Sequence, residues 1–315
     1  MKILANDGID SFGKRILEDA GFEVITAKIA QDELASRIVD YDILIVRSAT
    51  KVTKAIIQAS NLSLIARAGV GLDNIDMEAA AQKNISVVNT PNSSTRSVAE
   101  LVFAHLFSLA RFLHKSNRQM PQNGIDGFKE MKKEFSDGFE LKGKKMGIIG
   151  CGRIGNEVAK MAIGLGMEVL PYDLIQQEFS ICVSLANQYK AHDFNIKLQG
   201  FPLQTVLKES DFVSIHTPGS EEVLGMPELA LMKKGAVLIN CARGGVVNEK
   251  ALVLAIQSGD IAAAGIDVFE NEPPQNDNLL IQDNISMSPH IGASTKEAQE
   301  RVGIELADKI LSYFK

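Results

Sequence analysis

The sequence has few cysteines and no pattern that would pair them. Cys151, Cys182 and Cys241 are widely spaced and odd in number, with no CxxC motif or Cys/His cluster. They suit a reducing compartment and predict neither a disulfide framework nor a metal site. The N-terminal MKILANDGID lacks the basic and apolar parts of a secretory signal, and no apolar run approaches the ~20 residues that span a bilayer. We therefore expect a cytoplasmic protein without a membrane partner.

The sequence also has fewer basic than acidic residues. The chain has 33 Lys and Arg against 39 Asp and Glu, a net charge of −6. This balance disfavours nucleic acid as a partner but is compatible with a local basic site for an anionic substrate. Hydrophobic residues make up 45% and charged residues 23%, which is typical of a folded globular protein. At 315 residues the chain favours two domains, because a single core stops growing near ~250–300 residues.

Short apolar runs alternate with amphipathic stretches along almost the whole sequence. Strands are predicted at residues 2–6, 23–27, 42–48, 62–68 and 85–90, and again at 144–150, 167–173, 211–217, 236–242, 261–269 and 285–290. Helical patterns separate them, including a long one from Ser97 to about Met120 and a last one from Thr295 to Phe314. Such alternation predicts an α/β fold with parallel sheets covered on both faces. Residues Leu174 to Gly200 show no clean period and receive no assignment.

A predicted strand runs into a glycine-rich turn in the second half of the chain. Residues 145–149 lead into Gly150-Cys151-Gly152-Arg153-Ile154-Gly155, and a helical pattern follows at once. The first glycine permits a tight turn, the second lets backbone approach a pyrophosphate, and the third lets the helix pack on the strand. The helix N-terminus also favours negative charge. The motif predicts a dinucleotide site, and a packing turn in another kind of α/β protein is the alternative.

Asp173 makes this interpretation more specific. It ends the next predicted strand, roughly 20 residues beyond the glycines, where a carboxylate hydrogen-bonds the ribose hydroxyls of a dinucleotide. It would repel a 2′-phosphate, and the residues that follow, 174–177, contain no Arg or Lys to accept one. The sequence therefore predicts NAD as cofactor. Since the nucleotide half comes second, we expect the first half to handle the substrate across an interdomain cleft.

Three polar residues, Arg243, Glu272 and His290, stand at the ends of apolar segments. Strand ends of a doubly wound sheet meet at one crevice, so these side chains can converge. Oxidation of an alcohol by NAD needs a base for the hydroxyl proton, and histidine titrates near the working pH. A carboxylate beside it favours the imidazolium, and an arginine can hold a substrate carboxylate through two hydrogen bonds. We predict that all three are catalytic residues. The alternatives are a surface ion pair for Arg243, a solvated loop charge for Glu272 and a hydrogen bond to a backbone carbonyl for His290.

The remaining histidines have no such chemical context. His105 and His114 lie in the long helical pattern and are interpreted as structural, while His192 falls in the unassigned segment. Cys241 lacks an evident base and is interpreted as packing beside the cofactor. The residues that end the strand 211–217 are predicted to form a wall of the nucleotide site and not to catalyse: His216, Thr217 and Pro218.

The sequence resembles the D-isomer-specific 2-hydroxyacid dehydrogenases along nearly its whole length. The matching runs, in the order of that family, are GCGRIG at 150–155, NCARGG at 240–245, GIDVFE at 265–270 and SPHIG at 288–292. The resemblance implies that Arg243 orients the substrate, that Glu272 pairs with His290, and that His290 is the acid and base. It also implies that Asp267 lies near the nicotinamide. Positions expected to contact the cofactor in addition are Cys241, Ala242 and Gly292.

For the architecture, the resemblance implies two doubly wound domains and a homodimer built largely by the long helix. A flavodoxin-like substrate domain would comprise residues 1–91 plus 292–315, with the last helix returning to the first half, and a Rossmann NAD domain would comprise 92–291. Longer relatives continue into a regulatory ACT domain beyond the position of Lys315, so we expect a short form without serine feedback through it. The stretch 174–200 is longer than usual in the family and 219–227 is shorter, so we expect the adenine side of the cofactor site to differ from that of the relatives.

Within the family, the first half resembles the D-3-phosphoglycerate dehydrogenases through residues 45–53, 66–76 and 92–100. Independently, Arg47, Lys51 and Arg67 fall at strand ends or in loops of this half. In an acidic protein, such a cluster, with Ser48 beside it, suits a phosphate-bearing substrate, and ordinary surface charge is the alternative. The neighbouring backbone amides are predicted to bind the substrate carboxylate, assisted by Asn74, and belong to Gly69, Val70 and Gly71.

These observations predict a reversible oxidation of 3-phospho-D-glycerate to 3-phosphohydroxypyruvate with NAD, the entry to serine synthesis. A hydroxypyruvate or glyoxylate reductase of the same family is the first alternative, and the basic cluster would then be idle. The second alternative is an NAD-sensing interaction protein, since some relatives act as transcriptional corepressors.

Overall fold

The computed structural model describes residues 1–184 and 193–314. They divide into two compact units, unit 1 with Met1–Ser97 and Ala293–Lys315, and unit 2 with Val98–Gly292. The first boundary lies later than residue 91, where the sequence placed it, because the intervening loop is tied to the last helix. Asn92 and Ser93 both hydrogen-bond to the Glu305 carboxylate, and Arg301 donates to the Ser93 carbonyl at 3.0 Å.

Unit 1 is built on a five-stranded parallel sheet. In spatial order its strands are β2 (Glu23–Ile25), β1 (Lys2–Ala5), β3 (Ile43–Val46), β4 (Leu64–Arg67) and β5 (Ser86–Asn89). Its helices are α1 (Ser11–Asp19), α2 (Leu34–Arg37), the short η1 (Ile38–Asp40), α3 (Lys54–Ala59), α4 (Met77–Gln82) and α13 (Lys296–Tyr313). The order reverses between β1 and β3, as in flavodoxin-like folds, and ligands of such sheets bind where the order reverses.

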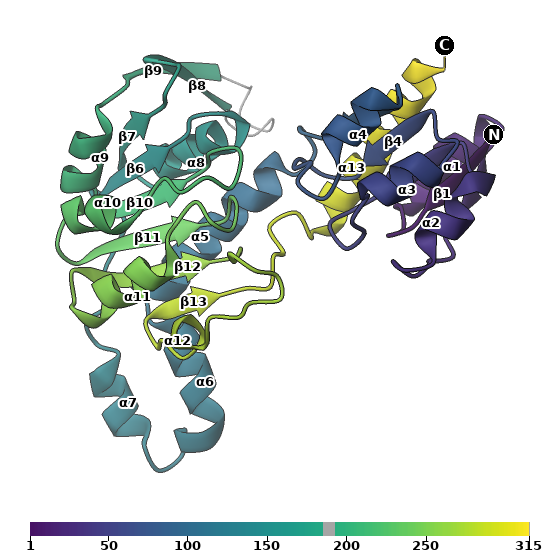
Figure 1. Cartoon of the computed structure of the whole chain (residues 1–315). Coiled ribbons are helices and arrows are strands. Elements are labelled where there is room, and N and C mark those ends of the chain that lie inside the picture. Colours follow the sequence, from purple (N-terminus) through teal and green to yellow (C-terminus); the bar gives the residue numbers. More distant parts are fainter. Residues whose placement is uncertain (185–192, 315) are drawn as a thin grey trace. The chain divides into compact units, whose positions relative to one another are not determined.

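Side chains that alternate along the strands build a core on each face of this sheet. In β1, Ile3 and Ala5 pack with α1 and α13, whereas Leu4 packs on the face covered by α2, α3 and α4. Helices α1 and α13 meet backbone to backbone, since a Cβ on Gly13 would lie 2.4 Å from the Gly303 carbonyl oxygen. Figure 1 shows the yellow α13 among the purple elements of the start of the chain. The last helix therefore completes the core of unit 1.

Unit 2 is built on a six-stranded parallel sheet. In spatial order its strands are β13 (Ile285–Met287), β12 (Ile261–Ile266), β11 (Ala236–Asn240), β10 (Phe212–Ile215), β6 (Lys145–Ile149) and β7 (Glu168–Tyr172). Its helices are α5 (Thr95–Ala110, which begins in unit 1), α6 (Leu113–Asn123), α7 (Phe128–Glu134), α8 (Arg153–Gly164), α9 (Leu203–Glu209), α10 (Met226–Leu231), α11 (Glu249–Gln257) and α12 (Asp277–Leu280). The order reverses between β6 and β10, the point where dinucleotides bind in Rossmann folds.

The long helix expected from Ser97 to Met120 is two helices. Helix α5 ends at Ala110, and Phe112 adopts a left-handed conformation with φ 54° before α6 begins. The Phe139 amide donates to the Ala110 carbonyl at 3.1 Å, and the Phe112 ring lies 6.0 Å from that of Phe135. Contacts from distant residues therefore stop a helical pattern that continues in the sequence.

Residues 174–200, which the sequence left unassigned, contain an antiparallel pair of strands, β8 (Glu178–Ser184) and β9 (Asp193–Gln199). Phe179 and Ile181 are buried in the core shared with α8, whereas the next residue, Cys182, is exposed. Apolar residues thus alternate over part of β8, but the run is too short to give a clean period in the sequence. His192 lies outside the described residues.

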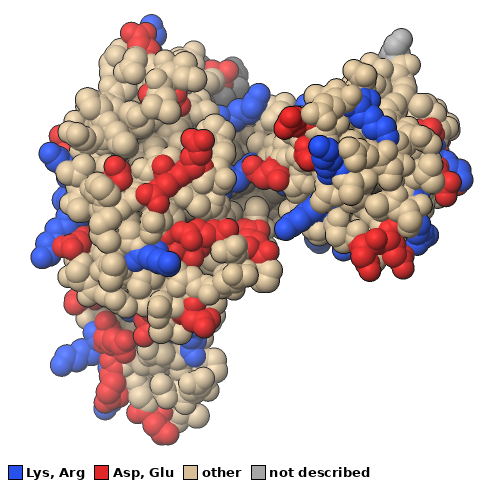
Figure 2. All heavy atoms as spheres, in the orientation of Figure 1, with Lys and Arg blue, Asp and Glu red and all other residues tan. Residues whose placement is uncertain are grey.

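Charged side chains are spread over the surface. On the face drawn in Figure 2, acidic and basic residues are interspersed on both units. Among the residues that the structure describes, no helix combines the length and the apolar character required to cross a membrane.

Candidate active site

The glycine turn between β6 and α8 has the geometry of a pyrophosphate cradle. Gly150 has φ 90°, and a Cβ on it would lie 2.8 Å from the His216 carbonyl carbon. A Cβ on Gly155 would lie 2.1 Å from the Gly150 oxygen, so this glycine lets α8 approach the strand. At Gly152, the N-cap of α8, a Cβ would meet nothing within 4 Å. Open space thus faces the start of a twelve-residue helix whose first residues are Arg153 and Ile154, a setting that favours a bound anion.

Asp173 follows β7 and lies beside this turn. Its carboxylate accepts hydrogen bonds from the backbone amides of Cys151, at 2.9 Å, and Ile175, at 3.0 Å. Partial burial raises the pKa of Asp173, but these amides and that of Gln176 outweigh it, and the net pKa is lowered. The side chain is therefore an anion held at the edge of the turn, which suits acceptance of hydrogen bonds from ribose hydroxyls.

The residues after β10 line the other side of the sheet reversal. Burial lowers the pKa of His216 to about 3, so its imidazole is neutral at physiological pH and is no acid or base there. Its Nε2 shares a hydrogen bond of 2.8 Å with the Ser214 hydroxyl. The Thr217 hydroxyl and the Asn156 Oδ1 atom are buried without a hydrogen-bond partner in the described part of the chain. Buried polar atoms without a partner, near the reversal point of the sheet, fit a dinucleotide that would bond to them.

Cys241 and Ala242 follow β11 and are both buried. Burial, reinforced by the nearby Asp267 carboxylate, raises the pKa of the Cys241 thiol, which therefore stays protonated and unreactive. The Asn240 side chain fixes this turn, since it accepts from the Ala242 amide and donates to the Arg243 carbonyl, each at 3.0 Å. The turn thus presents Arg243 from a rigid strand end.

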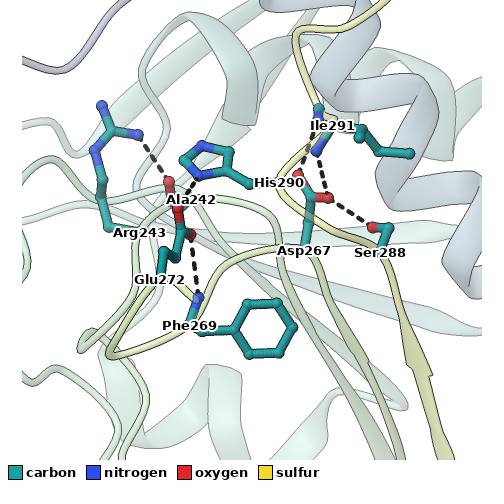
Figure 3. Close-up of polar contacts among 9 residues, drawn as sticks. Ala242, Arg243, Asp267, Phe269, Glu272, Ser288, His290 and Ile291 are labelled. Atoms are coloured by element: carbon teal, nitrogen blue, oxygen red, sulfur yellow. Dashed lines mark hydrogen bonds and ion pairs between the residues drawn. The ribbon is translucent and has the colours of Figure 1, made fainter. Parts of the chain in front are cut away.

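An imidazole and a carboxylate meet at the carboxyl ends of β12 and β13. The Nδ1 atom of His290 lies 2.8 Å from Glu272 Oε2, and the other Glu272 oxygen accepts from the Phe269 amide at 3.4 Å. Figure 3 shows the side chains of Arg243, Glu272 and His290 gathered together, with the Arg243 Nη1 atom donating to the Ala242 carbonyl at 2.7 Å. Because Glu272 engages Nδ1, the second ring nitrogen of His290 is the one left for a substrate hydroxyl.

This pair borders a hollow and remains open to solvent. The His290 side chain is 41% exposed and that of Glu272 38%. The hollow has a volume of about 400 Å³, and its other lining residues are largely apolar: Phe269, Pro273, Pro274, Met287, Ser288 and Pro289. An acid–base pair beside an apolar hollow can exchange a proton with a ligand while part of its surroundings exclude water.

The loop that carries His290 is held by Asp267, which is 1% exposed. One oxygen accepts from the Ser288 hydroxyl at 2.6 Å and from the Ile291 amide at 2.8 Å, and the other from the Gly292 amide at 2.9 Å (Figure 3). His290 itself has φ 52°, an uncommon conformation for a residue with a side chain, and its amide donates to the Asp267 carbonyl at 2.8 Å. Asp267 and Gly292, both expected to contact the cofactor, thus fix the loop of His290, and the sequence analysis did not single out Ser288, which takes part in the same set of bonds.

In unit 1 the predicted substrate residues lie in the loop after β3, at the end of β4 and in the loop after β4. Arg47, Ser48 and Lys51 lie in the loop after β3, whose amides at Arg47 and Thr50 donate to Asp7 at 2.8 and 3.0 Å. The Asn74 side-chain amide donates to the Arg47 and Thr50 carbonyls, each at 2.7 Å. Asn74, expected to assist at the substrate carboxylate, therefore shapes the Arg47 loop, and Asp7 shares that task without having been singled out in the sequence.

Arg67 is the last residue of β4, and the loop that follows carries Gly69 to Gly71. A Cβ on Gly69 would lie 1.5 Å from Arg67 Nη1, so the guanidinium folds over this glycine. The Gly69 amide donates to the Arg67 carbonyl at 2.9 Å, and the Asn89 side chain donates to the Val70 carbonyl at 2.6 Å. Since the Gly69 amide is engaged within the loop, the amides of Val70 and Gly71 are the better candidates for an anion.

Comparison with known proteins agrees with this geometry. Residues 103–292 match the family model described as D-isomer specific 2-hydroxyacid dehydrogenase, NAD binding domain. A hydroxypyruvate reductase of Thermotoga maritima is 41% identical over 98% of this chain and 97% of its own length. A D-3-phosphoglycerate dehydrogenase of Methanocaldococcus jannaschii is also 41% identical over 98% of this chain, which spans only 57% of that relative.

Among solved structures, the NAD-bound 3-phosphoglycerate dehydrogenase of Entamoeba histolytica is similar with a TM-score of 0.78 and 28% identity, over 100% of this chain and 95% of that one. The two parallel sheets accord with the fold of this solved structure. The chain therefore belongs to the D-isomer-specific 2-hydroxyacid dehydrogenase family and is an NAD-dependent oxidoreductase.

Proposed function

We propose that the protein catalyses the reversible oxidation of 3-phospho-D-glycerate to 3-phosphohydroxypyruvate with NAD, the entry to serine synthesis. The observation that carries the chemistry is the 2.8 Å contact between His290 Nδ1 and Glu272 beside Arg243. When bound, NAD supplies the acceptor for the hydride that leaves C2 of the substrate. His290 takes the hydroxyl proton on Nε2 as the C2 oxygen becomes a carbonyl, and returns it in the reverse reaction.

The other two residues support this proton transfer. Glu272 accepts a hydrogen bond from Nδ1–H, which fixes the tautomer and stabilises the imidazolium that forms. Arg243 holds the substrate carboxylate, so that C2 and its hydroxyl are presented to the nicotinamide and to His290. The amides of Val70 and Gly71 are proposed to share the carboxylate.

Phosphate recognition is assigned to Arg47, with Lys51 and Arg67 as further cations. Support comes from a hollow of unit 1 with a volume of about 480 Å³, which Arg47 lines together with Lys296, Thr295 and Gln299. Two acids, Asp10 and Glu300, also line it, so the arginine is not surrounded by cations alone. The hollow lies at the loops after β1 and β3, the reversal point of this sheet, where ligands of such folds bind.

The phosphate assignment predicts a difference between two substrates. With Arg47→Ala, we expect the KM for phosphohydroxypyruvate to rise roughly 10- to 100-fold, because a charge-assisted hydrogen bond is lost. The KM for hydroxypyruvate should change by less than about threefold, since that substrate has no phosphate for Arg47 to bind. Initial rates of NADH oxidation with each substrate measure both values.

Arg37→Ala is the matched control, because Arg37 is an exposed arginine of unit 1 that pairs with Glu33 at 3.5 Å. It should leave both KM values unchanged. Equal and small losses for the two substrates in Arg47→Ala would contradict the phosphate assignment and favour the second candidate, a hydroxypyruvate or glyoxylate reductase. The relative from Thermotoga maritima, which this chain matches along nearly its whole length, favours that candidate.

A different class of function, an NAD-sensing interaction protein, has the opposite signature. It would bind NADH and reduce no 2-oxo acid in a panel that includes phosphohydroxypyruvate, hydroxypyruvate and glyoxylate. The close His290–Glu272 contact supports retained chemistry instead.

We further propose a homodimer formed through the α5–α7 region. Support comes from its exposed apolar side chains: Phe107, Leu113, Met120, Ile125 and Phe128 are 42%, 55%, 45%, 94% and 53% exposed. Sedimentation equilibrium should give twice the mass of the chain. Leu113→Asp with Phe128→Asp should yield monomers, whereas Leu254→Asp, at a residue of α11 that is 53% exposed, should not. A monomeric wild-type protein would contradict the assignment.

A further inference from the structure

A buried histidine of α5 joins two serines at the exit of β13. The Nδ1 atom of His105 lies 2.9 Å from the Ser286 hydroxyl, and its Nε2 atom lies 2.9 Å from the Ser288 hydroxyl. The residue is 4% exposed. A Cβ on Gly265 of β12 would lie 2.7 Å from the His105 Cβ, so the sheet has a glycine where the histidine packs. Strand β12 therefore leaves room for the His105 side chain at this position.

The hydrogen bonds continue from His105 to the catalytic loop. Ser288 is bonded to Asp267 at 2.6 Å, and Asp267 in turn accepts from the Ile291 and Gly292 amides. Ser288 precedes His290 in the sequence, and Ile291 and Gly292 follow it. The His290 amide itself donates to the Asp267 carbonyl. The orientation of Ser288 thus affects the anchor of the backbone that carries the catalytic imidazole.

The chemistry of the groups assigns each proton. The Asp267 carboxylate accepts, so the Ser288 hydroxyl donates to it and must itself accept from His105 Nε2–H. Nδ1 is then unprotonated and accepts from the Ser286 hydroxyl. Burial lowers the pKa of His105, an effect that the Asp267 charge opposes and that His114 reinforces, so the neutral ring required by this order persists at physiological pH. In this series of hydrogen bonds each donor then faces an acceptor.

We propose that His105 is a positioning residue for the acid–base step: through Ser288 and Asp267 it holds residues 288–292 so that His290 keeps its place against Glu272. This inference rests on the proposed role of His290. It adds a residue from a distant helix that touches neither substrate nor cofactor. Without the Nε2–H donor, the Ser288 hydroxyl can rotate away from Asp267, and the loop gains freedom.

The test compares side chains that retain different bonds. In His105→Gln, the amide nitrogen can occupy the place of Nε2 and donate to Ser288, whereas in His105→Asn the shorter amide reaches only the Nδ1 side and Ser286. We expect His105→Asn and His105→Leu to lower kcat about 10- to 100-fold, because a shift of about 1 Å in a catalytic group costs this much. His105→Gln should retain at least about a third of wild-type kcat, since it restores the bond to Ser288. KM for the 2-oxo acid and the Kd for NADH should change less than about threefold in all three, because no ligand contact is removed.

A primary isotope effect separates positioning from a general loss of stability. With NADH deuterated at the transferred position, the isotope effect on kcat should increase in His105→Leu, because hydride transfer becomes slower relative to product release. His114→Leu is the matched control: this half-buried histidine bonds to the Ser108 and Asp283 carbonyls and is not connected to Ser288. It should lower the melting temperature without changing kcat or the isotope effect.

Ser288→Ala tests the same path without replacing a large core residue. It should reproduce the kcat of His105→Leu, and the double variant should lose little more, because both substitutions break one chain of bonds. Folded His105→Leu or Ser288→Ala protein with wild-type kcat would overturn the inference, as would equal losses in His105→Gln and His105→Asn. Activity retained in a His290 variant would instead refute the proposed catalytic role itself.

Discussion

Replacement of His290 by glutamine is expected to lower kcat for 2-oxo acid reduction by about 100- to 10,000-fold, the usual contribution of a positioned acid or base. Glutamine keeps a polar group at the position but cannot gain or lose a proton near neutral pH. The Kd for NADH, measured by fluorescence titration, should change little, because the cofactor cradle lies at β6 and β7, away from the β12 and β13 ends.

Glu272→Gln should have a smaller effect on kcat, about 10- to 100-fold, because the amide can hold the ring but does not stabilise its positive charge. Glu270→Gln is the matched control. Glu270 lies two residues away and accepts from the Glu249 amide at 3.0 Å, a bond that glutamine can keep. If Glu270→Gln lost as much activity as Glu272→Gln, the special role of the 2.8 Å contact with His290 would be refuted.

Arg243→Ala should lower kcat/KM about 100- to 1,000-fold, because the substitution removes the guanidinium that we propose binds the substrate carboxylate through two hydrogen bonds. Arg243→Lys keeps the charge but not the planar fork, and should recover only part of this loss. The measurement is the initial rate of NADH oxidation over a range of 2-oxo acid concentrations.

A substrate analogue with a carboxamide in place of the carboxylate is the control for the arginine. Wild-type enzyme should use it poorly, whereas Arg243→Ala should discriminate little between acid and amide, since the group that tells them apart is gone. If the variant still preferred the acid by the wild-type factor, the carboxylate would be bound elsewhere, and the amides of Val70 and Gly71 would be the next candidates.

Much of this fold can be predicted from the sequence, because the local pattern of apolar and polar residues agrees with the tertiary structure. Apolar runs such as 43–46 and 236–240 are strands buried on both faces, as the alternation with amphipathic helices predicts. The three glycines of the turn also have local reasons. Gly150 allows the tight turn, Gly152 leaves open space at the start of α8, and Gly155 lets α8 pack on the strand. The convergence of Glu272 and His290 follows from parallel strand ends that share one edge of a sheet.

What could not be predicted depends on residues far apart in the chain. Helix α5 ends where the Phe139 amide reaches the Ala110 carbonyl, and no residue near Phe112 signals that stop. His105 was interpreted as structural because nothing in its own segment indicates Ser286 and Ser288, more than 180 positions away. Asp267 was assigned to the cofactor by resemblance, and only the packed loop reveals its three internal donors.

The contact between Gly13 and Gly303 has a consequence for synthesis on the ribosome. Residues 98–292 form a continuous unit and can fold as soon as they emerge, whereas one face of the N-terminal sheet is covered only in part, by α1, until residues 296–313 arrive. The usual order, in which the segment made first also folds first, is thereby inverted. Until α13 has been synthesised, the layer that buries Ile3, Ile43 and Leu64 lacks Leu306, Ala307 and Ile310.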